Sequence, residues 1–130
     1  MKGQTQLDWR AIRERAALFP EEAFQFVREG LAYTTKLFHG EPPRNSEPCD
    51  DRRHVSGQQL CMGLRKMAIE RYGLLARTVM NKWGVRATDD FGVIVYALID
   101  RNELRQGERD SIEDFKSVYD FEESFGEAPR

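Results

Sequence analysis

Cysteine and histidine are scarce in this chain. Its 130 residues include two cysteines, Cys49 and Cys61, and two histidines, His39 and His54. Two cysteines cannot form the disulfide framework of a small secreted domain, so we expect reduced thiols and a cytoplasmic protein. The four residues are ten, five and seven positions apart. Structural zinc sites pair their ligands at closer spacing, so we expect no metal and no cofactor.

The same scarcity limits the catalytic possibilities. Cys61 and His54 lie seven positions apart, with a predicted helix start between them. No third residue is evident that would orient the imidazole, as a nucleophilic triad requires. We expect Cys61 to behave as a small apolar residue on a buried helix face, because it lies on the apolar stripe of its predicted helix. The sequence names no catalytic residue and favours a non-catalytic role.

Long apolar runs are also lacking. The longest dense apolar stretch, 91–99, is too short to cross a bilayer. Residues 1–6 have no apolar run behind them, so we expect no signal peptide and no membrane partner. Hydrophobic residues nevertheless make up 40% of the chain, enough for one sizeable core, so we expect residues 1–130 to form a single domain.

Charge is nearly balanced in total but unevenly distributed. Residues 52–86 carry eight basic residues against Glu70 alone, whereas residues 87–130 carry twelve acidic residues against five basic ones. Two interpretations stay open. The acidic tail folds over the basic middle and neutralises it, or the middle is a surface for an anionic partner such as RNA or DNA.

Apolar residues recur at helical spacing along most of the chain. Helix starts are predicted at Asp8, Pro20, Ser56 and Thr88, each a residue or position suited to the first turn. Gln59 stands three residues after Ser56, the spacing of a capping box. Another helix is expected over 74–83, with Leu75, Val79 and Trp83 on one side. We therefore predict a mainly α bundle of about five helices.

The predicted helices fall into segments of different composition. We expect a helix pair over 1–39, a proline-rich loop over 40–53, a helical core over 54–121 and an acidic tail over 122–130. Residues 104–119 leave two alternatives open. Ser111 with Asp114 has the spacing to cap a short helix, or the segment pairs with itself as a small β-hairpin, which would make the fold resemble a winged helix.

One stretch resembles a known family. His54 to Cys61, read as HVSGQQLC, is followed by Gly63-Leu64-Arg65. This pattern resembles the core motif of a small family of uncharacterised bacterial proteins, to which no function is assigned. The likeness continues through 72–77, 83–85, 90–92 and 118–121, about the last two thirds of the chain. It implies that residues 54–121 form one structural unit, and it implies no activity, cofactor or partner.

Two functions are compatible with these observations. The leading hypothesis is an intracellular adaptor or regulatory module that binds protein, with Phe121 and Phe125 of the acidic tail as exposed anchors. The alternative is nucleic-acid binding through the basic middle, because the segment 74–98 has the helix–turn–helix pattern with Gly84 in the turn. The candidate anion-binding residues are Arg65, Lys66, Arg77, Lys82 and Arg86. The oligomeric state is left open.

Overall fold

A computed structural model of the chain describes residues 8–41, 54–107 and 110–126. These residues form α1 (Trp9–Ala16), α2 (Glu21–His39), α3 (Gly57–Tyr72), α4 (Ala76–Lys82), α5 (Thr88–Asp100) and α6 (Phe121–Phe125), with the 3-10 helices η2 (Gly73–Leu75) and η3 (Ile112–Phe115). No strand occurs within 8–41, 54–107 or 110–126. The mainly α prediction is confirmed, and the described part of 104–119 contains η3 in place of the β-hairpin alternative.

Local caps begin the helices at the expected places. Asp8 accepts a hydrogen bond from the backbone amide of Ala11 at 3.1 Å and so caps α1. Ser56 and Gln59 form the predicted capping box, in which each side chain accepts from the other residue's amide, at 3.1 and 2.9 Å. These bonds satisfy amides that the first turn of a helix leaves unpaired. Within the described part of the chain, no helix has the length and apolar character needed to span a membrane.

Helix α5 begins at Thr88, as predicted. The capping side chain is that of Asp90, whose Oδ2 accepts from the amides of Arg86 and Ala87 at 2.8 and 3.2 Å. Thr88 is fully buried, and its hydroxyl bonds to the backbone near η3 instead. The predicted helix start at Thr88 is therefore confirmed, but the hydroxyl of Thr88 does not cap the helix, because the chain after α5 folds back over this position.

The segment 74–83 also differs from the single helix that we expected. It begins as η2, and a 3-10 turn rotates each residue by about 120° instead of 100°, which changes the direction that later side chains take. Ala76 and Met80 are therefore the buried residues of α4, whereas Leu75 is 54% exposed. Of the three residues that we expected on one side of a helix, Leu75 precedes α4, whereas Val79 and Trp83 are half-buried.

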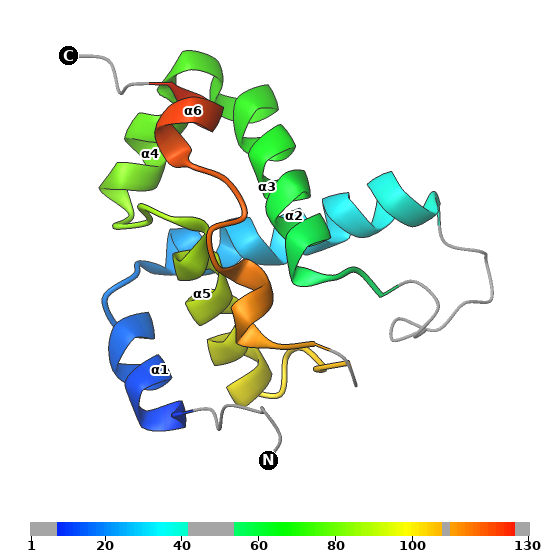
Figure 1. Ribbon diagram of the computed structural model, residues 1–130, viewed down its shortest axis with the longest axis vertical. Helices are drawn as coiled ribbons and strands as arrows, with labels where there is room; N and C mark the ends of the chain where they lie inside the picture. The colour runs from blue at the N-terminus through cyan, green and yellow to red at the C-terminus, as the bar shows by residue number, and fades with distance from the viewer. Residues whose placement is uncertain (1–7, 42–53, 108–109, 127–130) are drawn as a thin grey trace.

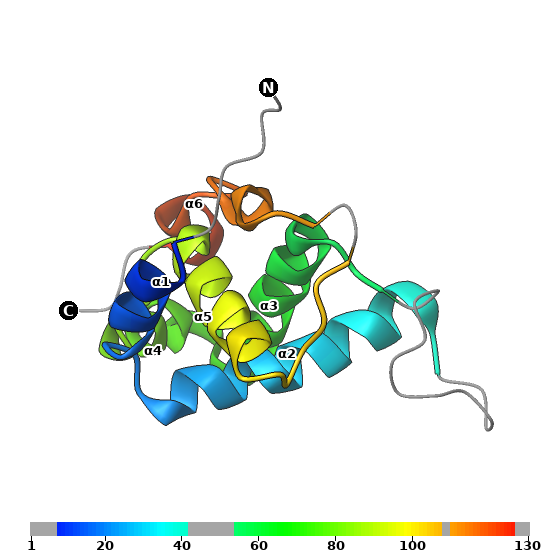
Figure 2. The ribbon, with the colours of Figure 1, turned by 90° about the horizontal axis from the view of Figure 1, so that it is seen from below.

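Helix α5 lies at the centre of the molecule. Figures 1 and 2 show it enclosed by α1, α2, α3 and the chain segment that contains η3. Every residue from Phe91 to Leu98 is buried. The burial of eight consecutive residues explains why α5 has no polar face, since a helix that packs on all sides requires apolar residues around its whole circumference.

Helices α2 and α3 cross at close range because glycine stands at the contact. A Cβ atom at Gly63 would lie 2.7 Å from the Cβ of Thr34, and one at Gly30 would overlap the side chain of Leu64. Thr34 is itself buried, and its hydroxyl donates to the carbonyl oxygen of Gly30 at 2.6 Å. At each glycine the backbone of one helix therefore packs directly against a side chain of the other. This contact places the start of α3 beside the end of α2.

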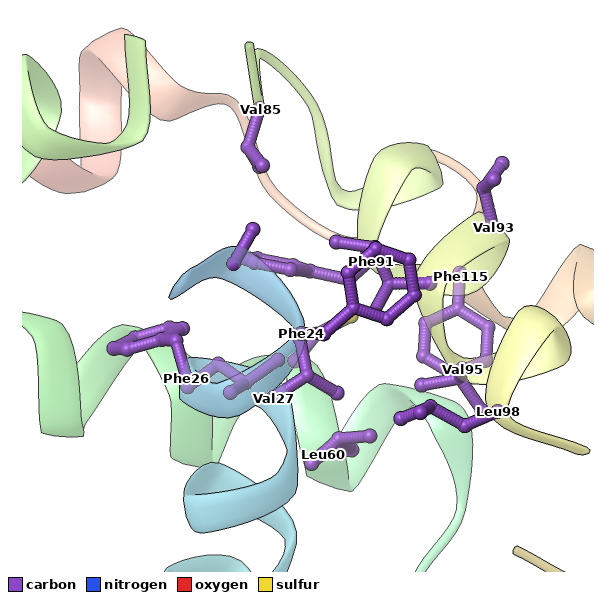
Figure 3. Close-up of a cluster of buried hydrophobic side chains, with 14 of the residues drawn as sticks. Phe24, Phe26, Val27, Leu60, Val85, Phe91, Val93, Val95, Leu98 and Phe115 are labelled. Carbon is purple, nitrogen blue, oxygen red and sulfur yellow. The ribbon is translucent and has the colours of Figure 1, made fainter. Parts of the chain in front are cut away.

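The hydrophobic core joins the N-terminal helices to the rest of the chain. Figure 3 shows side chains from α2, α3, α5 and η3 gathered in one cluster. Phe26 of α2 contacts both Trp83 and Phe91, with ring centroids 5.4 and 6.5 Å apart. Aromatic contacts at these distances add to the stability that comes from buried area alone.

Candidate functional site

A cleft lies where α2, the start of α3, α5 and residues of 102–105 and 110–115 meet. This cleft has a volume of about 480 Å³. Its lining combines apolar side chains with polar ones, among them Leu31, Leu60, Ile99, His54, Tyr96, Asp110 and Asp114. Cavities of roughly 300–1,000 Å³ with an apolar wall and a few convergent polar groups are typical small-molecule sites.

His54 and Asp110 form the closest polar contact of the cleft. The Nε2 atom of His54 lies 2.6 Å from Oδ2 of Asp110, although the two residues are far apart in the sequence. The carbonyl oxygen of His54 lies 2.9 Å from Nε2 of His39, so this ring nitrogen donates to it. His54 thus connects the end of α2, the start of α3 and the loop after α5. The sequence placed His54 at this helix start but did not predict Asp110 as its partner.

A turn in the loop after α5 holds Asp110 in place. The amide of Gly107 donates to Oδ2 of Asp110 at 2.9 Å, and Gln106 donates to the carbonyl oxygen of Asp110 at 3.0 Å. Gln106 also donates to the hydroxyl of Tyr96 at 3.2 Å. A Cβ atom at Gly107 would lie 3.1 Å from Nε2 of His54, so the absence of a side chain there allows the imidazole to approach.

The pKa of the Tyr96 hydroxyl shows that negative charge is concentrated at this part of the cleft. Tyr96 is 1% exposed, and burial together with the negative charges of Asp110 and Asp114 raises the pKa of its hydroxyl to about 12. Both carboxylates therefore act on the same point of the cleft wall. This end of the cleft is polar and acidic, whereas Leu31, Leu60 and Ile99 belong to its apolar side.

Cys61 lies outside the cleft, in the core. It is fully buried, and burial, with a smaller effect of Asp89, raises the pKa of its thiol to about 12. A thiol with this pKa carries almost no nucleophilic thiolate at neutral pH. Across the described ranges there is no group of three or more histidine, cysteine, aspartate or glutamate side chains able to hold a metal ion. Cys49 lies outside the described residues.

The five predicted anion-binding residues are spread over two helices and a turn. Arg65 and Lys66 lie on α3, Arg77 and Lys82 on α4, and Arg86 between α4 and α5. Lys66 forms an ion pair with Glu70 at 3.4 Å. Arg77 lies over the ring of Phe121, 5.9 Å from its centroid. Burial, and to a smaller extent Cys61, raises the pKa of the Tyr119 hydroxyl, whereas the positive charge of Arg65 lowers it. Arg65 therefore lies near Tyr119.

Acidic residues of α5 and of the loop that follows it form ion pairs with the N-terminal helices. Arg13 binds Asp100 through two hydrogen bonds of 2.8 Å, and these hold the pKa of that carboxyl below its usual value. Further pairs join Arg15 to Asp90 at 2.9 Å and Arg28 to Glu103 at 2.9 Å. Among the described residues, no ion pair joins a lysine or arginine of 65–86 to an acidic residue after 86. The described contacts therefore show no direct ion pairing between the basic middle of the chain and the acidic residues that follow it.

Two expectations about the other candidate residues are corrected by their burial. Phe121 is 3% exposed and packs against Phe91 and Phe125, with ring centroids 5.9 and 5.0 Å apart. It is therefore a core residue and not an exposed anchor, and Phe125 is half-buried against it. Helix α5 is the second helix of the predicted helix–turn–helix pattern, the one that would read DNA. It is buried on all sides from Phe91 to Leu98, so it cannot lie in a DNA groove.

Comparison of the chain with family models, curated proteins and solved structures finds no match. The resemblance of residues 54–65 to a bacterial family motif therefore stays a prediction. Asp110, Asp114 and Tyr96 were not predicted as site residues. The glycine and aspartate at 107 and 110 are typical of a turn, but no pattern along the chain indicates which residue such a turn contacts.

Proposed function

We propose that this chain is a non-catalytic, cytoplasmic regulatory module that binds a small organic molecule in the cleft. The observation that carries this proposal is the cleft itself, about 480 Å³ in volume, with an apolar side and a cluster of polar groups at one end. Its walls come from three helices and from a loop fixed by the contact between His54 and Asp110. Binding there would stabilise the loop against the helices, and such a change is suited to regulation.

The two serine hydroxyl groups at the cleft cap helices, and this supports a binding role in place of a catalytic one. The hydroxyl of Ser56 accepts a hydrogen bond from the amide of Gln59, and that of Ser111 accepts one from the amide of Glu113, both at 3.1 Å. Each hydroxyl therefore serves as a helix cap. His54 is held by Asp110, which makes an aspartate–histidine pair, but the described contacts place no serine or cysteine against it. A hydrolytic mechanism of the triad type would need such a nucleophile within hydrogen-bond reach.

Nuclear magnetic resonance with a library of small fragments tests this proposal. We expect amide shifts to cluster on 54–60, 95–104 and 110–115, which contain most of the cleft lining. Ile99→Trp should fill the cleft and abolish these shifts. Val79→Trp is the matched control, since Val79 is also half-buried but does not line the cleft. Shifts that are scattered, or that persist in Ile99→Trp, would contradict the proposal.

A second candidate function is binding of nucleic acid through the basic segment. The observation that favours it is that Arg65, Arg77, Lys82 and Arg86 form no ion pair with any acidic residue that the structure describes. Unpaired cations gain most from phosphate, because binding releases counterions. Retention on heparin over a salt gradient tests this function. Lys82→Glu combined with Arg86→Glu should lower the eluting salt concentration.

The matched control for that test changes the same number of charges elsewhere. Arg10→Glu combined with Lys116→Glu reverses two exposed cations outside the basic segment. Equal loss of retention in both double variants would show only the effect of net charge, and it would contradict a specific surface. Loss confined to Lys82→Glu with Arg86→Glu would support the surface. Neither result depends on the cleft, so the two candidate functions are tested separately.

A further inference from the structure

The acidic end of the cleft contains carboxylate oxygens that accept no hydrogen bond from the residues that the structure describes. Asp110 accepts from Gly107 and contacts His54 through Oδ2, and Asp114 accepts from the amide of Ser111 through Oδ2 at 3.1 Å. Within the part of the chain that the structure describes, Oδ1 of each carboxylate accepts no hydrogen bond. Each carboxylate thus keeps one oxygen for a further donor.

The balance of charge at this end is negative. Glu103, a third acidic residue of the lining, forms an ion pair of 2.9 Å with Arg28, which also pairs with Glu21. Asp110 is paired with His54, whereas Asp114 has no cation within ion-pair distance among residues 8–41, 54–107 and 110–126. Arg105 lines the rim of the cleft and makes contacts of its own. Asp114 is therefore the carboxylate whose charge is left for a bound molecule.

The rest of the cleft lining is largely apolar and would favour a ligand with an apolar body. Leu31 and Leu60 from α2 and α3 face this space together with Val95 and Ile99 from α5 and Leu104 from the loop. A ligand that covers these side chains gains from the removal of apolar surface from water. A ligand with an apolar body and one positively charged head matches both sides at once, since an ammonium group donates three hydrogen bonds and accepts none.

On the basis of the proposed function, we propose that the cleft binds an organic amine, with its ammonium group at Asp114 and Asp110 and its apolar body against α2, α3 and α5. The two carboxylates supply the free Oδ1 acceptors, and the charge on Asp114 selects a cation over a neutral or anionic molecule. An alcohol of the same shape would bind through the apolar side alone. A carboxylic acid would be repelled by the two aspartates.

Three probes of one shape test the proposal: 4-phenylbutylamine, 4-phenylbutanol and 4-phenylbutanoate. Dissociation constants come from shift titration of the full chain. We expect the amine to bind about tenfold more tightly than the alcohol, which corresponds to about 1.4 kcal/mol, and the acid to bind least. Asp114→Asn should weaken the amine about tenfold and leave the alcohol unchanged. Glu113→Gln is the control, since Glu113 is a neighbouring acid outside the lining.

The outcomes separate this inference from the proposed function. If the alcohol or the acid binds the cleft as tightly as the amine, the inference is wrong and the proposed function stands. If none of the three probes or library fragments shifts the cleft residues, both are wrong. Asparagine at position 114 keeps an acceptor for the amide of Ser111, so the η3 cap should persist. Should that variant unfold, Asp110→Asn provides the second test of the same charge effect.

Discussion

The buried hydroxyl of Thr88, at the first residue of α5, donates a hydrogen bond of 2.6 Å to the carbonyl oxygen of Phe115. The hydroxyl oxygen of Thr88 in turn accepts a hydrogen bond from the amide of Val118 at 3.1 Å. One side chain therefore satisfies two backbone groups of the segment that covers α5. Phe115 lies on η3, and it lines the cleft together with Asp114 of the same 3-10 helix.

Replacement of Thr88 by valine should destabilise the fold. Thr88→Val preserves the shape of the side chain but leaves the carbonyl of Phe115 and the amide of Val118 without their partner. Each unpaired buried group costs about 1–3 kcal/mol, so we expect the free energy of unfolding to fall by about 2–4 kcal/mol. Urea denaturation measures it. Thr88→Ser keeps the hydroxyl and should lose much less, and equal losses in the two variants would contradict the role of the hydroxyl.

Gly63 should tolerate no side chain, although it lies within a helix. Gly63→Ala would normally stabilise a helix by about 1 kcal/mol. Here the new Cβ would lie 2.7 Å from the Cβ of Thr34 and 2.9 Å from its Cγ2. We therefore expect the free energy of unfolding to fall by about 1–3 kcal/mol, as in other overpacked contacts.

The sign of this change separates packing from helix propensity. Ala32→Gly, at an exposed position of α2, measures the cost of a glycine in a helix of this protein. We expect a loss of roughly 1 kcal/mol there. Denaturation curves of both variants make the comparison. A stabilised Gly63→Ala would show that α2 and α3 are farther apart than the structure places them.

The helix starts could be predicted from the sequence because their causes are local. Ser56 and Gln59 lie three positions apart, and Asp8 directly precedes its helix, so spacing alone shows the bonds that they form. The same holds for Ser111 and Asp114, whose side chains cap η3 from a spacing of three positions. In each case the partner lies within one turn of the chain.

The hydrogen bonds of the Thr88 hydroxyl could not be predicted, because its partners lie 27 and 30 positions away. A threonine before two aspartates is typical of a cap, and only the return of the chain over α5 gives its hydroxyl a different role. The cleft was missed for the same reason. His54 was noticed in a motif, but Asp110 comes from a loop that no periodic pattern connects to it.

Stability should decrease at alkaline pH in a way that depends on Cys61. The folded thiol stays protonated up to a pKa of about 12, whereas the unfolded thiol releases its proton near its ordinary value of 9.0. Between these values the unfolded state binds fewer protons than the folded state, so the free energy of unfolding falls as pH rises. The stability that the protonated thiol contributes is fully present below pH 9.0.

Urea denaturation at several pH values tests this dependence. Tyr96 and Tyr119 also have raised pKa values and act in the same direction, so the wild type alone does not isolate the thiol. Cys61→Ala removes one titrating group and should show a shallower decrease of stability above pH 9.0 than the wild type. Parallel decreases in both proteins would mean that Cys61 titrates alike in the folded and unfolded chain.

Arg77 presents a conflict between stability and a possible anion-binding role. Its Nε and Nη1 atoms are buried and have no hydrogen-bond partner among the residues that the structure describes. The contact with the ring of Phe121, at 5.9 Å from the centroid, lies at the outer limit for a cation–π interaction. Burial of guanidinium N–H groups without acceptors costs free energy that this contact repays only in part.

Replacement of Arg77 by methionine should therefore stabilise the protein. Methionine keeps an unbranched chain against Phe121 and removes the buried donors, so we expect a gain of about 1 kcal/mol in the free energy of unfolding. Lys82→Met is the control, because Lys82 is exposed and its loss should change stability by less than about 0.5 kcal/mol. Denaturation in urea measures both, and a destabilised Arg77→Met would mean that the guanidinium has a partner. If stability rises while retention on heparin falls, Arg77 is kept for an anion at the expense of stability.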